Sequence, residues 1–501
     1  MQNLSKLIYK AAPQAFYVGG VLRDSLLKKY SGDIDLALPR EQVKPAATAL
    51  AKTLKASVFE MDSNFCVWRL TTKGGLQIDL SALVGKDIKE DLKRRDFTIN
   101  ALAYPTQKLP LIKTKKSKGK TEFLLTNLKK DFLLDLNNGV KDLKLKKIRH
   151  NAKAVFEEDP LRLLRALRVA AELKFSITPA TLKIIKQNAA LINQSAGERL
   201  QEELKRLFRA DGARQNIELL DKAGLLFALL PEIEKQKHCA EVYYGKGGVF
   251  THTMLVVERA EYLLNHLKEA FPKYHKKLAA FAPDKALFIM AALLHDIAKP
   301  ATAKKIKGRL RFFHHEEKGA AMAEVFLKQL KYSTAEQKLI YKMIFYHLRP
   351  SNLASNEIIT DKGVYKFFKE LGDSAIPMLL LCWADYTSYV SPVQVRRLMR
   401  QTERPIMSIE EAKLKANIGK TLRHLQVLNF LFNKYFNETK KIILPRGLID
   451  GRDIMATLKI PPSPKVGEIL EQAIFAQIEG KIDSKTSALE WLLKNKAEFL
   501  K

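Results

Sequence analysis

The chain has 501 residues, with 86 Lys and Arg against 54 Asp and Glu, which gives a formal charge of +32. Hydrophobic residues make up 47 % and charged residues 28 %, a balance that excludes wholesale disorder and collagen-like repeats. At roughly 150 residues per domain the length indicates several domains, and no apolar run reaches the roughly 18–20 residues of a membrane span. Three widely spaced cysteines make neither a disulfide framework nor a zinc motif, which favours a reducing cytoplasm. The positive charge is compatible with a polyanionic partner.

The first hundred residues alternate between strand and helix patterns, which predicts a small α+β unit. Strands are expected at 15–18, 33–38, 57–60, 65–71 and 76–80, and helices at 21–29 and 46–55. Gly74 and Gly75 are expected to form a hairpin turn. The stretch 113–120 carries five lysines and no acidic residue, and we expect a mobile insertion there, with contact to RNA as the alternative.

From about residue 159 the apolar residues recur at helical spacing nearly to the end of the chain. Helices are expected at 161–173, 180–192, 198–208 and 217–227. We therefore predict an α+β fold in which a small mixed head precedes an all-helical body. The boundaries expected from the pattern are 1–140, 141–240, 241–390 and 391–501.

The segment YVGGVLRDSLLKKYSGDIDLAL (17–38) carries the first pattern with chemical meaning. A predicted strand runs into Gly19 and Gly20, and a predicted helix that contains Arg23 and Asp24 follows at once. Glycines let backbone N–H groups approach a phosphate closely, the start of a helix favours negative charge, and the arginine adds a cation. A phosphate-bearing ligand is therefore expected at this turn.

Three aspartates accompany this turn. Asp33 and Asp35 are two residues apart on a predicted strand, so both face the same side. Paired carboxylates beside a phosphate site suit Mg²⁺, and Asp79 from a neighbouring strand is a candidate third carboxylate. This set predicts phosphoryl or nucleotidyl transfer with two metal ions. The alternative is that the three are turn, cap or strand-end residues.

Two further charged segments follow, DLKRRDFTINALAY (91–104) and EDPLRLLRALRVAAELKF (158–175). In the first, the groups that could serve a ribose and a triphosphate are Arg94, Arg95, Asp96 and Asn100. In the second, residues at helical spacing are expected on nearby faces of one helix: Asp159, Arg162, Arg165 and Arg168. A neighbouring Asp and Arg can match a base edge, because Arg donates and Asp accepts. The alternative is a surface ladder of salt bridges.

GGVLRD followed by DID resembles the nucleotidyltransferase signature of the DNA polymerase beta superfamily. DLKRRDFTINALAY, EDPLRLLRALRVAAELKF and GERLQEELKRLF (197–208) resemble, in the same order, motifs of its class II branch, which contains CCA-adding tRNA nucleotidyltransferases and bacterial poly(A) polymerases. The resemblance implies a catalytic head at 1–140, a neck at 141–240, Mg²⁺ bound by Asp33 and Asp35, and Asp79 as a further catalytic residue. It implies nucleotide binding by Gly19, Gly20, Arg23, Asp24, Arg94, Arg95, Asp96, Asn100, Glu158, Asp159, Arg162, Arg165 and Arg168.

Within that family, the resemblance implies that Asp159 and Arg162 select CTP or ATP, while Arg165 and Arg168 serve the nucleotide and its phosphates. Poly(A) polymerases of this class usually carry a GRRFRLAH-like stretch before the third carboxylate, and the corresponding region 64–80 lacks it, which favours tRNA as acceptor. The link between Asp79 and Arg94 is short, and loss of a longer loop there is associated in the family with enzymes that add only CC. We expect addition of CCA, or part of it, from CTP and ATP. The alternatives are a poly(A) polymerase and an enzyme that adds only CC or only A.

A second ordered pattern, H…HD…H…H…D, resembles the HD-domain metal phosphohydrolases and implies an HD domain at 241–390. Imidazoles and carboxylates from different helices can hold a divalent metal that activates water against a phosphoester. The implied metal ligands are His252, His295, Asp296 and Asp385, and His315 and His347 are auxiliary, with His314 as an alternative to His315. Mg, Mn, Ni, Co or Fe would suit the site; the alternative for each histidine is a satisfied core position.

The last part of the chain, 391–501, resembles the tail of HD-containing family members, whose basic helices would hold tRNA through its phosphates. The alternative is a plain helical packing domain. A different class of function is an HD phosphohydrolase with a non-catalytic RNA-binding head. We expect no membrane association, a cytoplasmic location, and tRNA, CTP and ATP as partners; no protein partner can be inferred from the sequence.

Overall fold

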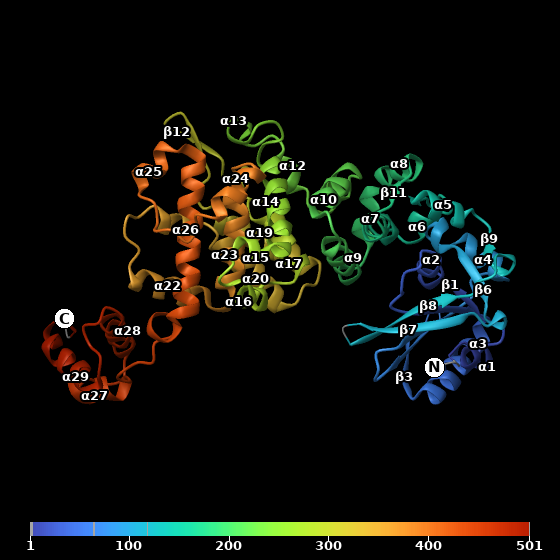
Figure 1. Ribbon diagram of the computed structural model, residues 1–501, viewed down its shortest axis with the longest axis horizontal. Helices are drawn as coiled ribbons and strands as arrows, with labels where there is room; N and C mark the ends of the chain where they lie inside the picture. The colour runs from blue at the N-terminus through green and yellow to red at the C-terminus, as the bar shows by residue number, and fades with distance from the viewer. Residues whose placement is uncertain (1–3, 64–65, 118, 500–501) are drawn as a thin grey trace. The chain divides into compact units, whose positions relative to one another are not determined.

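The computed structural model describes residues 4–63, 66–117 and 119–499 (Figure 1). Asn64 and Phe65, from the predicted strand region, and Lys118, from the lysine-rich stretch, lie outside the described residues. The chain forms two compact units, 1–211 with 215–229 and 212–214 with 230–501. The expected head and most of the expected neck therefore belong to one unit.

A seven-stranded sheet forms the base of the first unit. Its strands lie in the order β3 (Ala56–Asp62), β4 (Val67–Thr72), β5 (Gln77–Ala82), β2 (Ile34–Leu38), β1 (Phe16–Val18), β6 (Leu102–Pro105) and β9 (Leu134–Asp135). β2 and β5 are parallel, and the other neighbouring pairs are antiparallel. The predicted strands are confirmed with small shifts of their ends, and β4 and β5 form the predicted hairpin around Gly74 and Gly75.

Helices α1 (Leu4–Ala11), α2 (Gly20–Leu26), α3 (Arg40–Leu54) and α4 (Ile88–Lys93) accompany this sheet. The core is built from alternating strand positions, so Ile34, Leu36, Ile78 and Leu80 are fully buried. The helix expected at 46–55 begins earlier than predicted, because α3 continues across Pro45 and begins at residue 40.

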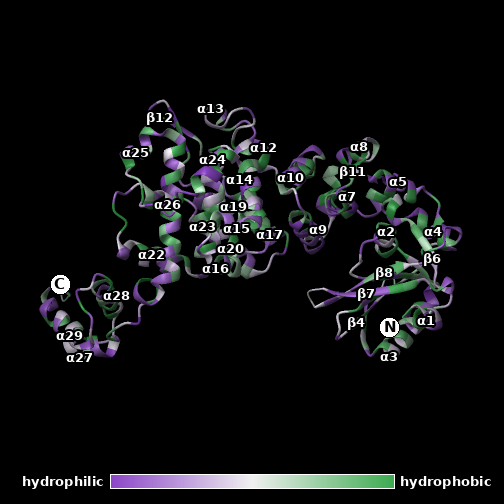
Figure 2. Ribbon diagram, viewed as in Figure 1, coloured by the Kyte–Doolittle hydropathy of each residue, from purple (hydrophilic) through white to green (hydrophobic). Residues whose placement is uncertain are grey.

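The lysine-rich stretch is part of a β-hairpin, β7 (Leu111–Ser117) and β8 (Lys120–Thr126), so the expectation of a mobile insertion is wrong. Ile112, Phe123 and Leu125 are buried on one face of the hairpin. The Thr121 N–H donates to the Gly75 carbonyl at 2.9 Å, which fixes the hairpin to the β4–β5 turn. Figure 2 shows the hydrophilic character of the hairpin near its tip.

The remainder of the first unit is mostly helical. Its elements are α5 (Gly139–Leu145), β10 (Lys147–Ile148), α6 (Val155–Glu158), α7 (Leu161–Leu173), β11 (Ser176–Ile177), α8 (Pro179–Gln187), α9 (Gly197–Arg209), α10 (Ala213–Lys222), which begins in the second unit, and α11 (Leu225–Leu229). The expected single helix over 217–227 is wrong, because Gly224 has a φ of +75° and separates α10 from α11. The expected helix over 180–192 is also shorter, since α8 ends at residue 187.

The second unit is a helical assembly with one small hairpin, β12 (Lys304–Ile306) and β13 (Arg309–Arg311). Its helices are α12 (Glu232–Gln236), α13 (Glu241–Tyr244), α14 (Gly248–Asn265), α15 (Leu267–Ala270), α16 (His275–Phe281), α17 (Lys285–Leu294), α18 (Lys299–Thr302), α19 (His315–Gln329), α20 (Thr334–Phe345), α21 (Arg349–Ala354), α22 (Asp361–Leu371), α23 (Ala375–Thr387), α24 (Pro392–Met399), α25 (Ile409–Leu414), α26 (Ala416–Asn437), α27 (Gly451–Leu458), α28 (Pro464–Ile478), α29 (Lys485–Lys494) and α30 (Lys496–Phe499).

Helix α17 lies at the centre of this unit, and its residues 286–294 are all buried. It packs against α14 and α23, and Figure 2 shows the hydrophobic residues gathered on these helices. Among the described residues, no single helix is long and apolar enough to cross a membrane, although the bent pair of α16 with the segment 285–302 reaches that threshold jointly. The C-terminal helices α27, α28 and α29 share a small hydrophobic core of their own.

Candidate active site and a buried histidine–aspartate cluster

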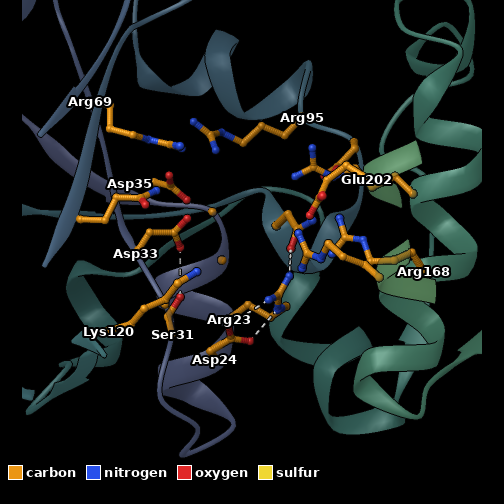
Figure 3. Close-up of a pocket in the computed structure, with 18 of the residues that line it drawn as sticks. Arg23, Asp24, Ser31, Asp33, Asp35, Arg69, Arg95, Lys120, Arg168 and Glu202 are labelled. Carbon is orange, nitrogen blue, oxygen red and sulfur yellow. Dashed lines mark hydrogen bonds and ion pairs between the residues drawn. The ribbon is translucent and has the colours of Figure 1, made fainter. Parts of the chain in front are cut away.

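A cavity of about 1010 Å³ opens in the first unit, with walls from the sheet and from helices α7 and α9 (Figure 3). Most of the predicted head residues line it: Gly19, Gly20, Arg23, Asp24, Asp33, Asp35, Arg95, Asp96, Asn100, Asp159, Arg162, Arg165 and Arg168. Arg94 and Glu158 are not among the lining residues; their side chains face each other at 3.8 Å in more exposed positions.

Three carboxylates converge beside this cavity. Asp35 and Asp79 are directly opposite each other in the parallel β2–β5 pair, and one oxygen from each of Asp33, Asp35 and Asp79 lies within 4.8 Å of the others. Arg69 on β4 donates to both oxygens of Asp79, at 2.8 and 2.7 Å. Arg69 was not predicted from the sequence, although the hairpin around Gly74 and Gly75 places it opposite Asp79.

The environment of these carboxylates disfavours their charge. Burial, together with the charges of Asp33 and Asp79, raises the pKa of Asp35 to about 7. Burial and the charge of Asp79 also raise the pKa of Asp33. Oxygen ligands held this close together gain from a shared divalent cation, because the cation removes their mutual repulsion. The donor set therefore fits Mg²⁺ or a similar hard ion.

Gly19 allows the turn to approach these carboxylates. Its φ is +67°, a conformation that strains other residues, and a Cβ atom there would lie 3.0 Å from Oδ2 of Asp35. The guanidinium of Arg95 is also close, since the same Cβ would be 3.5 Å from its Nη1. A phosphate at this turn would thus meet backbone and an arginine together.

A chain of polar contacts links helix α2 to helix α7. The Nη1 of Arg23 donates to Asn100 at 2.9 Å, and the Asn100 amide donates to Asp96 at 2.9 Å. The other oxygen of Asp96 pairs with Nε of Arg165 at 2.9 Å. Burial opposes ionisation of Asp96, but Arg165, Asn100 and the Phe97 N–H together keep its pKa below the ordinary value. These side chains therefore form a fixed charged wall of the cavity.

The expected base-selecting pair lies on the same cavity, but the two residues do not share a helix. Asp159 precedes α7, so the prediction that it lies on one helix with Arg162 is wrong. Pro160 follows Asp159, and the Asp159 carboxylate accepts from Leu161 N–H at 3.2 Å and from Arg199 at 2.8 Å. Arg162 donates to the Val155 carbonyl at 3.1 Å. An acceptor and a donor are thereby held on neighbouring turns of the chain.

Arg168 is held differently from the other arginines, because only 4 % of it is exposed. Its Nε and Nη2 donate to Glu203 at 2.8 and 3.3 Å, and its Nη1 donates to Glu172 at 2.8 Å. Arg206 also donates to Glu172. These contacts join α7 to α9, so the expected contact of Arg168 with a phosphate stays a prediction.

Several lining residues were not found from the sequence: Ser31, Lys120, Glu202 and Arg206. Figure 3 shows Lys120 beside Ser31 and near Asp33. Lys120 comes from the hairpin that was expected to be mobile, so its sequence position carried no indication of the cavity. Glu202 and Arg206 are four residues apart on α9, a spacing that places them on one face of the helix.

The second unit contains the other predicted constellation. Six residues, each at most 8 % exposed, meet there: His252, His295, Asp296, His315, His347 and Asp385. Asp296 is central, because Oδ2 is 3.1 Å from Nε2 of His295 and Oδ1 is 3.4 Å from Nε2 of His315. Nε2 of His252 is 3.2 Å from Asp385. His314 is exposed and lies 3.5 Å from Glu317 instead.

The histidines of this cluster share one orientation. The Nδ1 atoms of His295, His315 and His347 lie 2.8, 2.7 and 2.6 Å from backbone carbonyl oxygens, which requires each Nδ1 to carry the proton. Nδ1 of His252 faces the Ser388 hydroxyl at 3.2 Å. Each Nε2 lone pair therefore faces the centre, the arrangement that metal-ligating histidines have.

Metal ligation also explains the unsatisfied atoms of the cluster. Nε2 of His252, His295 and His315 and Oδ1 of Asp296 are buried without a hydrogen-bond partner in the described part of the chain, whereas Oδ2 of Asp296 pairs with the Lys299 ammonium at 2.5 Å. Two sets of three residues each offer ligand atoms within 4.8 Å of one another: His252, His295 and Asp385, and Asp296, His315 and His347. Nitrogen and carboxylate donors in this number fit divalent transition metals.

Comparison with known proteins agrees with this division of the chain. Residues 15–149 match the poly A polymerase head domain, 174–237 the probable RNA and SrmB-binding site of polymerase A, and 249–389 the HD domain. The chain is 27 % identical to the A-adding tRNA nucleotidyltransferase of Deinococcus radiodurans, over 95 % of this chain and 94 % of that protein. It is 28 % identical to the CC-adding tRNA nucleotidyltransferase of Thermus thermophilus, over 96 % and 93 %. A solved complex of a CCA-adding enzyme with ATP has the same fold, with a TM-score of 0.61 and 20 % identity over 98 % of this chain and 95 % of that one.

Because the pKa of Asp35 is raised in the folded state, ionised Asp35 lowers the free energy of unfolding of the metal-free protein. Between about pH 4 and 7 the folded state keeps a proton that the unfolded state has lost, so the free energy of unfolding falls as the pH rises. We expect Asp35→Asn to raise that free energy by about 1–3 kcal/mol near pH 8, after a discount for the opening to solvent, and to change it little near pH 4. Urea denaturation of the metal-free protein at both pH values measures the difference.

The matched control is Asp131→Asn, at an exposed aspartate in the same unit. It should leave the free energy of unfolding unchanged at both pH values. An Asp35→Asn variant no more stable than the wild type near pH 8 would contradict the electrostatic account of the site.

Proposed function

Because the chain belongs to the family of class II tRNA nucleotidyltransferases and poly(A) polymerases and carries an HD domain, we propose that it adds CCA, or part of it, to the 3′ end of tRNA from CTP and ATP. It is a nucleotidyltransferase, and in this proposal its substrates are tRNA and one or both of CTP and ATP. One observation carries the proposal: Asp33 and Asp35 line the same cavity as Asp159 and Arg162. A metal-binding pair and a base-reading pair thus face one nucleotide-sized space.

In the proposed reaction the 3′ oxygen of the tRNA bonds to the α-phosphorus of the nucleotide, and the bond to pyrophosphate breaks. Magnesium held by Asp33 and Asp35 would supply activation of the hydroxyl and neutralise the leaving group. The protein's own part is to orient and to neutralise. Gly19 lets the backbone approach the phosphates, and Arg23 and Arg95 place fixed positive charge near them.

Selection of the base needs no nucleic-acid template in this proposal. Asp159 accepts and Arg162 donates, and together they can pair with the base edge of cytosine or adenine. Arg199 on helix α9 donates to the Asp159 carboxylate and so helps to orient it. The contacts of Arg168 with Glu203 and of Arg206 with Glu172 hold α7 against α9.

A narrower candidate function is addition of CC alone. Only residues 83–87 connect β5 to α4, which leaves no room for a long flexible loop between Asp79 and Arg94. Relatives that match nearly the whole chain include one named for A addition and one named for CC addition, so family membership leaves the number of added residues open. A poly(A) polymerase remains the alternative with a different acceptor.

We expect purified protein with Mg²⁺ to extend a tRNA transcript that lacks its 3′ end. Supplied with CTP and ATP, it should add three residues if it completes CCA, two if it adds CC, and one on tRNA ending in CC if it adds only A. Asp33→Asn and Asp35→Asn should each lower the rate at least about 100-fold, because charge stabilisation at the reacting phosphate is lost. Denaturing gels of the end-labelled tRNA measure both outcomes.

Asp131→Asn again serves as the control and should keep the wild-type rate. A long ladder of adenosines on unrelated RNA would replace the proposal with a poly(A) polymerase. Unchanged extension by the double variant of Asp33 and Asp35 would refute the assignment of the active site.

The HD cluster supports a second activity, hydrolysis of a phosphoester. His252, His295, Asp296 and Asp385 would hold a first divalent metal, and His315 and His347 with Asp296 would hold a second. A bound metal would supply a water of lowered pKa as nucleophile. The chain itself fixes the imidazole tautomers through backbone carbonyls and keeps the cluster dry.

We expect about two Mn²⁺ ions per chain in the HD domain, because its ligands form two groups. The measurement is elemental analysis of gel-filtered protein that carries Asp33→Asn and Asp35→Asn, so that the head contributes no metal. Adding His315→Ala and His347→Ala should remove about one ion, whereas adding His314→Ala should remove none. Equal metal content in all three proteins would contradict the two-metal assignment.

A further inference from the structure

Strand β8 of the lysine-rich hairpin is held at two places beside the head cavity. At the β4–β5 turn, the Thr121 hydroxyl donates to the Gly74 carbonyl at 2.7 Å. Near the start of β2, Phe123 and Ser31 exchange two backbone hydrogen bonds, each of 2.7 Å. The strand start that carries Lys120 is therefore fixed in place, although the residue itself is a lysine of an exposed hairpin.

Gly75 lets β8 come this close to the β4–β5 turn. Its φ is +72°, and a Cβ atom there would lie 2.3 Å from the Gly119 carbonyl oxygen and 2.9 Å from Cα of Lys120. A residue with a side chain would thus strain the turn and push the hairpin away. The backbone of Lys120 packs directly on the turn, and its side chain lines the cavity (Figure 3).

The order of the strands places Lys120 and the glycine turn on different sides of the aspartates. β2, which carries Asp35, lies between β1 and β5. Val18, which precedes Gly19 at the end of β1, is opposite Asp35 on one side, and Asp79 of β5 is opposite it on the other. Because Lys120 packs on the turn that leads into β5, it approaches the aspartates from the side that the glycine turn leaves open.

Lys120 can offer positive charge to a ligand on this side. Of the described residues that β4, β5 and the turn between them contribute to the lining, Arg69 is charged, and it pairs with both oxygens of Asp79. Lys120 is exposed, and within residues 4–63, 66–117 and 119–499 it makes no ion pair. Its ammonium can therefore bind an anion without breaking an existing pair.

Nucleotidyl transfer brings two anions to the same aspartates. The nucleotide carries a triphosphate, which the turn at Gly19 and the guanidinium groups of Arg23 and Arg95 would receive. The acceptor RNA carries a phosphodiester one ribose away from its 3′ hydroxyl, so this charge also has to come close to the carboxylates. With the triphosphate on the β1 side, the acceptor strand is left with the β5 side, where Lys120 lies.

We propose that Lys120 binds the last phosphodiester of the acceptor RNA and so positions its 3′ hydroxyl at Asp33 and Asp35. The inference rests on the proposed nucleotidyl transfer and assigns a residue to its RNA substrate. A lysine ammonium is a point charge on a flexible stem, so it contacts a phosphate whichever base is attached. The contact can therefore form again after each addition, with the phosphodiester that the addition has just made.

The first test uses two tRNAs that lack the CCA end and differ only in their last linkage, which is either a phosphodiester or an uncharged methylphosphonate. We expect kcat/KM of the wild type to be at least about tenfold higher for the charged acceptor, because the methylphosphonate cannot pair with an ammonium. In Lys120→Ala this ratio should fall to about threefold or less, whereas Lys120→Arg should keep most of it. Lys52→Ala, which removes an exposed lysine of α3 outside the cavity lining, should keep the full ratio.

A ratio in Lys120→Ala equal to that of the wild type would overturn the inference. The same holds if Lys120→Ala raises the KM for CTP and leaves the KM for tRNA unchanged, since Lys120 would then serve the triphosphate instead of the acceptor.

Equilibrium binding separates failure of this contact from failure of the proposed reaction. In filter binding at low salt without nucleotide, the wild type should bind the charged acceptor about fivefold more tightly than the methylphosphonate, and Lys120→Ala should bind both equally. If no nucleotide is added to either acceptor, the proposed reaction fails, and the affinity difference decides the contact alone. Equal affinity of the wild type for the two acceptors would then overturn it.

Discussion

The repulsion among three carboxylates is the constraint on which the first unit depends. The parallel pairing of β2 with β5 sets Asp35 opposite Asp79, and the adjacent Asp33 completes the group. Strands with buried Ile34, Leu36, Ile78 and Leu80 hold them there, because the sheet could relieve the repulsion only by giving up its own core. Burial and the charges of Asp33 and Asp79 raise the pKa of Asp35, which shows that this position disfavours a further negative charge. Arg69 relieves part of the repulsion by pairing with Asp79.

The second unit also contains a buried carboxylate, but it is stabilised by neighbouring nitrogen groups. Asp296 is buried among imidazoles and one ammonium rather than among other carboxylates, and its neighbours His295 and Lys299 hold its pKa well below the ordinary value although burial opposes this. Backbone carbonyls fix the rings, so the polar centre of the unit is built into the helix ends that surround it. One chain therefore contains two candidate metal sites of different composition, an oxygen-only group on strands and a mixed nitrogen and oxygen group on helices.

Local patterns in the sequence predict the parts of both sites that depend on spacing. The two-residue interval of Asp33 and Asp35 predicts a shared face from backbone geometry alone. The order of histidines and aspartates predicts the HD cluster only through its resemblance to the HD-domain phosphohydrolases, because these residues lie on separate helices. What escaped prediction depends on contacts between distant segments. The hairpin that brings Lys120 to the cavity is stabilised by buried Phe123 and Leu125, just beyond the lysine-rich stretch, and by the Gly75 turn. Local propensity at Pro45 likewise yields to the packing of α3.

The contact between Asp96 and Arg165 has an evolutionary consequence. Asp96 lies in the segment that follows α4, and Arg165 lies on α7. Because Asp96 is buried, the positive charge of Arg165 is needed to neutralise its carboxylate. If homologous genes recombined between codons 96 and 165, the hybrid could inherit a carboxylate from one parent and a mismatched partner from the other, leaving a buried charge unanswered. Such a hybrid would keep the full stability of its parents only if both carry the same pair, so the two motifs depend on each other physically.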